Sequence, residues 1–244
     1  MSPLRGIIPP RRFPGVTYAL IGTNVVFFAY EIALGNRLQP FLLAYGWVPA
    51  SFSQALADGQ VPALTPLLIS MFLHGGWLHL LGNLLYLHIF GGYVEHRLGH
   101  LRYLYFYCLG GVVAVLTQTY ASPLSPTPMI GASGAIAAVV GGYCVFYSTV
   151  QGQTLVPLIL STRGIHVQAL WYLLLWLVFQ LLSGVSGLSP EGQEFAGVAW
   201  WAHLGGFLAG LILGPLFLVK KKRRPPRTTL PLPPLWDHPK SALR

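Results

Sequence analysis

Long apolar stretches separated by short polar connections dominate the chain. A helix needs about 20 mostly apolar residues to cross the hydrocarbon core of a bilayer. Six stretches reach or nearly reach that length: Thr17–Leu34, Trp77–Tyr93, Leu101–Ala121, Ile130–Val150, Val167–Ser186 and Val198–Val219. The pattern therefore predicts an all-α fold, a polytopic membrane bundle of six transmembrane helices.

The other segments divide the chain around this bundle. Residues 1–16 form a basic N-terminal segment, residues 17–219 hold the six-helix membrane domain, and residues 220–244 form a basic, Pro-rich tail. Inside the domain, residues 35–76 form a long outer loop, whose apolar segments Phe41–Val48 and Pro66–Leu73 are too short to span. We expect these two segments to lie in the membrane interface or to pack against the bundle.

Composition supports a membrane protein. Hydrophobic residues make up 54% of the chain and charged residues only 9%, whereas soluble domains carry about 25% charged residues. The net charge of +9 lies at the chain ends and in short loops, which favours an anionic membrane surface over nucleic acid as its partner. The two cysteines, Cys108 and Cys144, lie in apolar stretches and predict neither a disulfide framework nor a metal site.

The distribution of lysine and arginine predicts the orientation. One set of connections carries most of them: Arg5, Arg11, Arg12, Arg97, Arg102, Arg163, Lys220, Lys221, Lys222, Arg223, Arg224 and Arg227. The opposite set holds only Arg37. Basic loops stay on the cytoplasmic side, so both termini are predicted to be cytoplasmic, which agrees with an even number of spans.

Four polar residues inside the predicted spans are the candidates for chemistry, because such residues are costly in a bilayer. His79 and Asn83 share one face of the second span at i and i+4, Ser133 opens the fourth, and His203 lies early in the sixth. These three spans all run inward from the outer side. The four side chains are therefore expected at one depth below the outer surface.

Stripes of small residues indicate which spans pack together. They occur at intervals of four, as Ser133, Ala137 and Gly141 in the fourth span and as Gly206, Gly210 and Gly214 in the sixth. Small residues let helix backbones approach closely in lipid. The two spans are therefore expected to pack together and to bring Ser133 to His203.

A serine beside a histidine predicts nucleophilic catalysis. A neutral imidazole can take the hydroxyl proton and so activate Ser133 for attack on a carbonyl carbon. His79, Asn83 and the backbone N–H of Ser133 are candidate donors to the oxyanion. No acidic residue is expected at this depth, and Glu31 is expected to reach the interface. The sequence thus predicts a dyad, with activity that falls when acid protonates His203.

Four motifs together resemble the rhomboid family of intramembrane serine proteases. They are His74-Gly-Gly-Trp-Leu-His79-Leu-Leu-Gly-Asn83, Gly91-Gly-Tyr-Val-Glu95-His-Arg-Leu-Gly99, Gly131-Ala-Ser133-Gly134 and Ala202-His203-Leu-Gly-Gly206. The resemblance implies a six-helix core, a dyad of Ser133 and His203, an oxyanion site with His79 and Asn83, and transmembrane proteins as substrates. Two departures concern Ala137, where some relatives have a tyrosine packed on the histidine, and the outer loop, which lacks their Trp-Arg pair.

The same residues allow other interpretations. Each of the four residues has a structural explanation on its own, as a packing serine, a buried histidine or interhelical hydrogen bonds. A rhomboid-like pseudoprotease that binds membrane proteins without cutting is the main alternative, and a transporter is another. His96 and His100 have metal-ligand spacing, but a solvated loop is favoured. Glu95 is expected to bond backbone or loop groups. We expect neither a metal nor a cofactor. The expected partners are membrane lipid and transmembrane proteins, and the expected location is a bacterial inner membrane.

Overall fold

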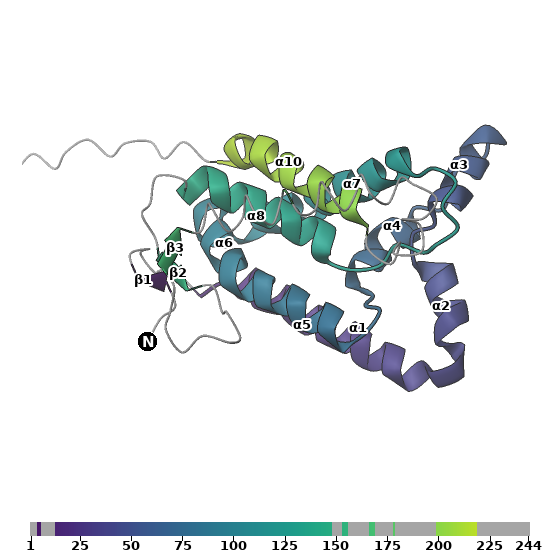
Figure 1. The fold of residues 1–244 in the computed structure, drawn as a ribbon, viewed down its shortest axis with the longest axis horizontal. Coiled ribbons are helices and arrows are strands. Elements are labelled where there is room, and N and C mark those ends of the chain that lie inside the picture. The colour runs from purple at the N-terminus through teal and green to yellow at the C-terminus, as the bar shows by residue number, and fades with distance from the viewer. Residues whose placement is uncertain are drawn as a thin grey trace, which may run out of the picture.

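The computed structural model describes residues 13–147, 178 and 199–218, together with three short strands at 4–5, 153–155 and 166–168 (Figure 1). The fifth predicted span falls almost entirely outside these residues, as does the tail 220–244. Neither the number of six spans nor the division into N-terminal segment, membrane domain and tail is therefore tested, and both stay predictions.

The described chain is a bundle of helices. The longer elements are α1 (Gly15–Leu34), α5 (Trp77–Tyr86), η3 (Leu87–Gly91), α6 (Gly92–Leu98), α7 (His100–Ala121), α8 (Ser133–Tyr147) and α10 (Trp200–Phe217). Within the described residues, three helices are long and apolar enough to cross a membrane, or four if the bent pair 65–72 and 77–98 is one span. The shorter α8 is also apolar, and five of the six predicted stretches coincide with helices. The prediction of a helical membrane bundle is therefore confirmed.

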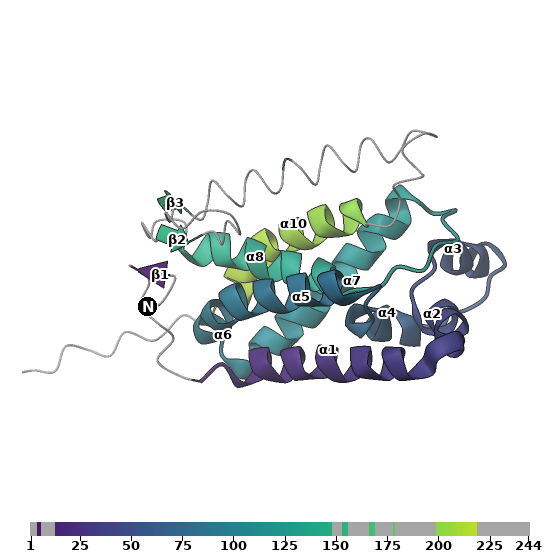
Figure 2. The ribbon, with the colours of Figure 1, turned by 60° about the horizontal axis from the view of Figure 1, so that its bottom comes forward.

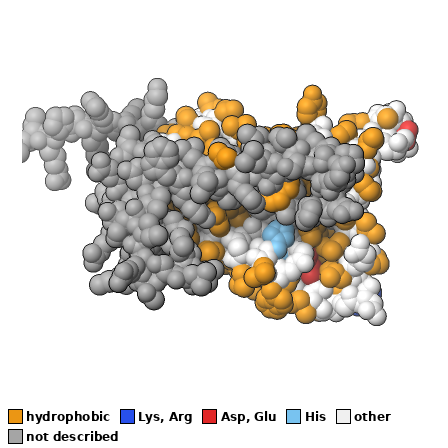
Figure 3. Space-filling view, viewed as in Figure 1, with side chains coloured by type: hydrophobic (Ala, Val, Ile, Leu, Met, Phe, Trp, Pro, Cys, Tyr) orange, Lys and Arg blue, Asp and Glu red, His pale blue; other side chains and the backbone are white. Residues whose placement is uncertain are grey.

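The outer surface matches this assignment. Large apolar side chains are exposed along the helices, among them Val26 on α1, Leu78 on α5, Leu101 on α7 and Ile212 on α10. Hydrophobic side chains also make up most of the described surface on the face shown in Figure 3. Such a surface is solvated by lipid rather than water, so the chain is an integral membrane protein.

The connection 35–76 folds into short helices at one end of the bundle (Figures 1 and 2). They are η1 (Gly35–Arg37), α2 (Leu38–Tyr45), α3 (Pro49–Ala57), α4 (Thr65–Ile69) and η2 (Ser70–Phe72). Helix α4 contacts both α2 and α7, and the chain bends by 91° between η2 and α5. The sequence left two places open for the short apolar segments, and α4 takes the second of them, against the bundle.

Helices α7, α8 and α10 pack closely through glycines. A Cβ on Gly110 of α7 would collide with the Cβ of Ala138 on α8, and one on Gly210 of α10 would collide with the Ala138 carbonyl oxygen. A Cβ on Gly141 would likewise collide with the Phe207 carbonyl oxygen. The small-residue stripes of α8 and α10 therefore face each other, as predicted, at backbone contact.

Glu95 ties the start of α1 to α6. Its carboxylate accepts hydrogen bonds from the Val16 N–H at 2.9 Å, the Thr17 N–H at 2.8 Å and the Thr17 hydroxyl at 2.6 Å. The first N–H groups of a helix have no partner within it, and a carboxylate is favourable at that end of the helix dipole. The prediction that Glu95 bonds backbone groups is confirmed. Its other partner is His100, which the sequence placed in a solvated loop.

A small antiparallel sheet lies outside the bundle. The strands β1 (Leu4–Arg5), β2 (Gln153–Leu155) and β3 (His166–Gln168) pair in the order β1-β2-β3, with Leu4 opposite Thr154 and Thr154 opposite Val167. The expectation of a purely helical chain omitted it, and Val167, predicted to open the fifth span, lies in β3. Strands of two or three residues are too short to show the two-residue alternation by which strands are recognised.

Candidate active site

Ser133 and His203 meet where α8 and α10 begin. Ser133 is the first residue of α8, and His203 lies in the first turn of α10. Its Nε2 atom lies 2.8 Å from the serine Oγ, and the histidine is only 9% exposed. The structure thus brings together, at hydrogen-bond distance, the two residues that the sequence singled out from positions 70 residues apart.

The helix contact below this pair explains the close approach. A Cβ on Gly206 would collide with the Gly134 carbonyl oxygen and would lie 3.3 Å from the Ala137 Cβ. Ala137, where some relatives have a tyrosine, is thus part of the contact between α8 and α10. The Trp200 ring instead lies edge-on to the His203 ring, at 6.3 Å and 87°. Sequence reasoning did not single out Trp200 as a neighbour of His203.

Gly131 lets His79 come close to the serine. Its φ of +123° is in the region that favours glycine, and a Cβ there would lie 2.6 Å from His79 Nε2 and 3.6 Å from Ser133 Oγ. The His79 Nδ1 atom accepts the Gly75 N–H at 3.4 Å. An accepting Nδ1 carries no proton, so in the neutral ring Nε2 carries it. The N–H donor of His79 therefore lies beside the loop that leads to Ser133.

Two more donors belong to the same region. Asn83 lies one helical turn after His79 on α5, which contacts α8. The Asn83 side chain is 7% exposed, and its Nδ2 atom has no hydrogen-bond partner in the part of the chain that the structure describes. Ser133 is the first residue of α8, so its backbone N–H has no acceptor within that helix. Gly131 thus brings the His79 ring beside Ser133, while Asn83 and the Ser133 backbone each carry a further N–H donor.

Contacts with the outer loop hold the segment before Ser133. Trp47 and Met129 exchange backbone hydrogen bonds at 3.1 and 2.7 Å, and the Gly131 N–H donates to the Ser70 carbonyl at 2.8 Å. The Trp47 Nε1–H also donates to Thr119 Oγ1 at 2.8 Å. Sequence reasoning missed these positioning residues. The one available signal was a tryptophan, which needs a partner for its N–H when buried, inside a segment expected either in the interface or against the bundle.

Gln118 fixes the start of α10. Its Oε1 accepts the Ala202 N–H at 3.2 Å, and the same N–H also donates to the Ala199 carbonyl at 3.1 Å. The residue lies near the end of α7 and reaches the turn of α10 that carries His203. Gln118 therefore helps to place the imidazole, and its role depends on a contact between elements 84 residues apart that sequence cannot reveal.

A small cavity adjoins the serine. It has a volume of about 20 Å³, and its walls include Ser70, Met71, Gly111, Ser133 and Ala202. A cavity needs about 10–15 Å³ of such space to hold one water molecule. The space beside Ser133 is thus sufficient for a single water next to the hydroxyl.

Glu31 differs from its expected place. The sequence placed this carboxylate at the membrane interface, but it is 2% exposed and both of its oxygens accept the His74 N–H, at 3.0 and 3.2 Å. The outer loop folds back over the end of α1 and covers the side chain, which hydropathy cannot show. Among the described residues, no three His, Cys, Asp or Glu side chains are grouped to hold a metal ion.

Comparison with known proteins assigns the family. The sequence profile of the Rhomboid domain matches residues 62–220. The chain is 31% identical over 150 residues to Rhomboid-like protease 5 of Toxoplasma gondii, covering 59% of this chain and 15% of that protein. It is 25% identical over 154 residues to RHOMBOID-like protein 5 of Arabidopsis thaliana, covering 63% and 44%. It is 26% identical over 218 residues to YdcA of Bacillus subtilis (strain 168), provisionally named a rhomboid protease, covering 88% and 94%.

The first two of these relatives are much longer than the matched region, since the chain spans less than half of their length. The Bacillus subtilis protein is matched over nearly its whole length. The profile match includes α5, α7, α8 and α10, and with them all four predicted site residues. The chain belongs to the rhomboid family.

Proposed function

We propose that this protein is an intramembrane serine endopeptidase that cleaves transmembrane segments of other membrane proteins. The observation that carries the proposal is the 2.8 Å separation of Ser133 Oγ and His203 Nε2. The bond lies between helices whose surroundings are apolar, so the chemistry would take place within the membrane. Membership of the rhomboid family and relatives named as proteases support the same reaction.

The geometry allows a two-step acyl transfer. His203 Nε2 accepts the hydroxyl proton as Ser133 Oγ attacks the scissile carbonyl carbon. The resulting oxyanion is stabilised by N–H donors of His79, Asn83 and the Ser133 backbone. The intermediate collapses to an acyl-enzyme when the C–N bond breaks and the imidazolium gives its proton to the leaving amine. A water molecule, deprotonated by His203, then attacks the ester, and Ser133 regains its proton.

The proposed catalytic group is a dyad of Ser133 and His203, without a carboxylate as a third member. The carboxylates of the described residues bind other groups. Glu31 binds the His74 N–H, and Glu95 binds the start of α1. Asp58 accepts a bond from a side chain of its own helix end. The His203 ring would be oriented by the Trp200 ring and by the backbone contact of α8 with α10. A protonated imidazole cannot act as base, so cleavage is expected to fall when acid protonates His203.

The proposal includes the topology predicted from the basic residues. Six spans would place both termini in the cytoplasm and the start of α8 and α10 toward the outer side, most simply in a bacterial inner membrane. Substrates would be transmembrane helices that unwind near small or helix-breaking residues. A single cysteine at position 58 should react with an impermeant maleimide added outside cells, and one at position 222 should not. The opposite result would overturn this orientation.

Cleavage of defined substrates tests the activity. The purified protein is reconstituted in liposomes with a panel of single-span membrane proteins, and products are followed by mass spectrometry. The parent and the control Ser51→Ala, which alters an exposed serine on α3, should cut equally. Ser133→Ala and His203→Ala should lose cleavage and should lose labelling by a fluorescent fluorophosphonate. Binding of the panel without any Ser133-dependent cut would instead indicate the non-proteolytic alternative.

A further inference from the structure

The Glu31 carboxylate makes an unusual contact for an acidic residue in a membrane helix. It is 2% exposed, near the outer end of α1, and both of its oxygens face the backbone N–H of His74. Burying a charge or an unpaired acceptor in an apolar region is costly, and such residues in spans usually mark function. The mechanism above makes no use of this side chain.

The segment that Glu31 holds is the sharp connection between η2 and α5. The His74 Nδ1–H donates to the Phe72 carbonyl at 3.1 Å, which closes the turn on itself. Phe28, one turn before Glu31 on α1, packs edge-on against the rings of His74 and Trp77. The outer end of α1 therefore contacts this connection at two levels, with aromatic rings and with a carboxylate.

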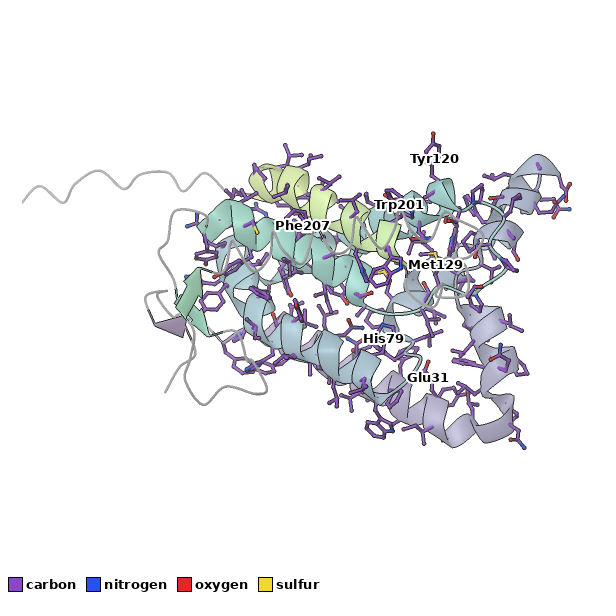
Figure 4. The ribbon with its side chains drawn as sticks, viewed as in Figure 1. Glu31, His79, Tyr120, Met129, Trp201 and Phe207 are labelled. Carbon is purple, nitrogen blue, oxygen red and sulfur yellow. The ribbon has the colours of Figure 1, made fainter. Side chains whose placement is uncertain are left out.

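The same connection supplies the partner of His79. The Gly75 N–H donates to His79 Nδ1 at 3.4 Å, and the His74 and His79 rings lie 5.1 Å apart. Figure 4 shows Glu31 and His79 close to each other in projection, where α1 passes α5. The orientation of the Gly75 N–H depends on the peptide that follows His74. A hydrogen bond to His74 therefore influences which nitrogen of His79 carries the proton.

We propose that Glu31 is a positioning residue for the oxyanion donor of His79. By accepting the His74 N–H, its carboxylate fixes the turn in which the Gly75 N–H occupies His79 Nδ1. The ring then presents its Nε2–H beside Gly131 and Ser133. This inference rests on the proposed function for its catalytic consequence, whereas the contact and the tautomer can be tested without it.

The side chain's reach, rather than its charge, is what the geometry requires. Glu31→Gln keeps an oxygen at the same distance and should hold the turn. Glu31→Leu fills the same space without an acceptor, and Glu31→Asp keeps the carboxyl group but retracts its oxygens by one C–C bond, roughly 1.5 Å. Asn24→Leu is the matched control, because Asn24 is also buried on α1 but its amide donates to the Leu20 carbonyl rather than to the turn before α5.

Activity and tautomer are measured on the full chain in detergent micelles. For Glu31→Leu we expect the rate of Ser133 labelling by the fluorophosphonate, and kcat for a cleaved single-span protein, to fall about 10- to 100-fold. This is at most the loss expected for one oxyanion donor. The KM of Glu31→Leu should stay within about threefold of the parent value. For Glu31→Gln and Asn24→Leu, both the labelling rate and kcat should stay within about threefold of the parent. Glu31→Asp should resemble Glu31→Leu, and it supplies the test if the leucine variant does not fold.

Two readouts separate positioning from simple structural support. The double variant Glu31→Leu/His79→Ala should be no slower than His79→Ala alone, because both changes remove the same donor. Nitrogen-15 spectra of labelled histidine should show an Nε2-protonated His79 in the parent and a changed tautomer mixture in Glu31→Leu. Additive losses, or an unchanged His79 spectrum in a slowed variant, would overturn the proposal. If the parent shows no Ser133-dependent activity, the proposed function fails while the spectra still decide the role of Glu31.

Discussion

Replacing Gly206 by alanine places one methyl group between α8 and α10, one turn below His203. Its Cβ would collide with the Gly134 carbonyl oxygen and lie 3.1 Å from the carbonyl carbon. Real Cβ atoms essentially never approach another heavy atom within 3.0 Å, so the two helices must separate by on the order of 1 Å. That shift would stretch the Ser133–His203 bond from 2.8 Å to about 3.8 Å, beyond the hydrogen-bond range.

The expected result is a large loss of activity with a small loss of stability. A misplacement of about 1 Å in a catalytic arrangement can cost about 100-fold in rate. Overpacking costs about 1–3 kcal/mol, but alanine in place of a helical glycine returns about 1 kcal/mol, so Gly206→Ala should lose only about 0–2 kcal/mol. Fluorophosphonate labelling of Ser133 measures the loss of activity, and thermal unfolding in detergent measures the loss of stability.

Gly214→Ala is the matched control from the same stripe. A Cβ at Gly214 would lie 3.4 Å from the Phe146 ring and 3.6 Å from Gly142, which is close to ordinary contact. This variant should label at the parent rate and unfold at the parent temperature or slightly above it. Parent-like labelling of folded Gly206→Ala would refute the argument that backbone contact sets the distance between Ser133 and His203.

Three further predictions follow from contacts away from that helix pair. Gly131→Ala should reduce fluorophosphonate labelling at least 100-fold, because its Cβ would strike His79 and its positive φ disfavours alanine; equal labelling would contradict the assigned approach of His79. Glu95→Ala should lower the free energy of unfolding by about 1–3 kcal/mol in detergent, because it strands the donors of Val16 and Thr17. Trp47→Phe should cost about 1 kcal/mol in the same assay through loss of its bond to Thr119, and an unchanged melting curve would argue against that bond.

The sequence was sufficient to predict the meeting of Ser133 and His203, for a physical reason. Both lie at the start of spans predicted to run inward, and the glycines that follow His203 at intervals of four indicated a face for close packing. In a membrane, the order and direction of the spans fix the depth of each residue. Two residues 70 positions apart can therefore be predicted to lie at the same depth. The small-residue stripe then supplies the lateral contact.

The parts that sequence missed depend on how the outer loop folds back. Glu31 was assigned to the interface from its distance along the span, but the connection before α5 covers it. Trp47 and Gln118 act through bonds to Thr119 and Ala202, on elements far away in the chain. Hydropathy reports depth and helix length, but it carries no information on which backbone group a buried side chain meets.

The link from Glu95 to the start of α1 has a consequence for how the protein is made. The donors of Val16 and Thr17 precede their acceptor by 79 and 78 residues. At about 5–20 residues per second, a ribosome needs roughly 4–16 s to extend the chain from one to the other. During that interval the N–H groups of Val16 and Thr17 lack this acceptor. Completion of this end of the helix therefore belongs to a late stage of biogenesis, after α5 has been synthesised.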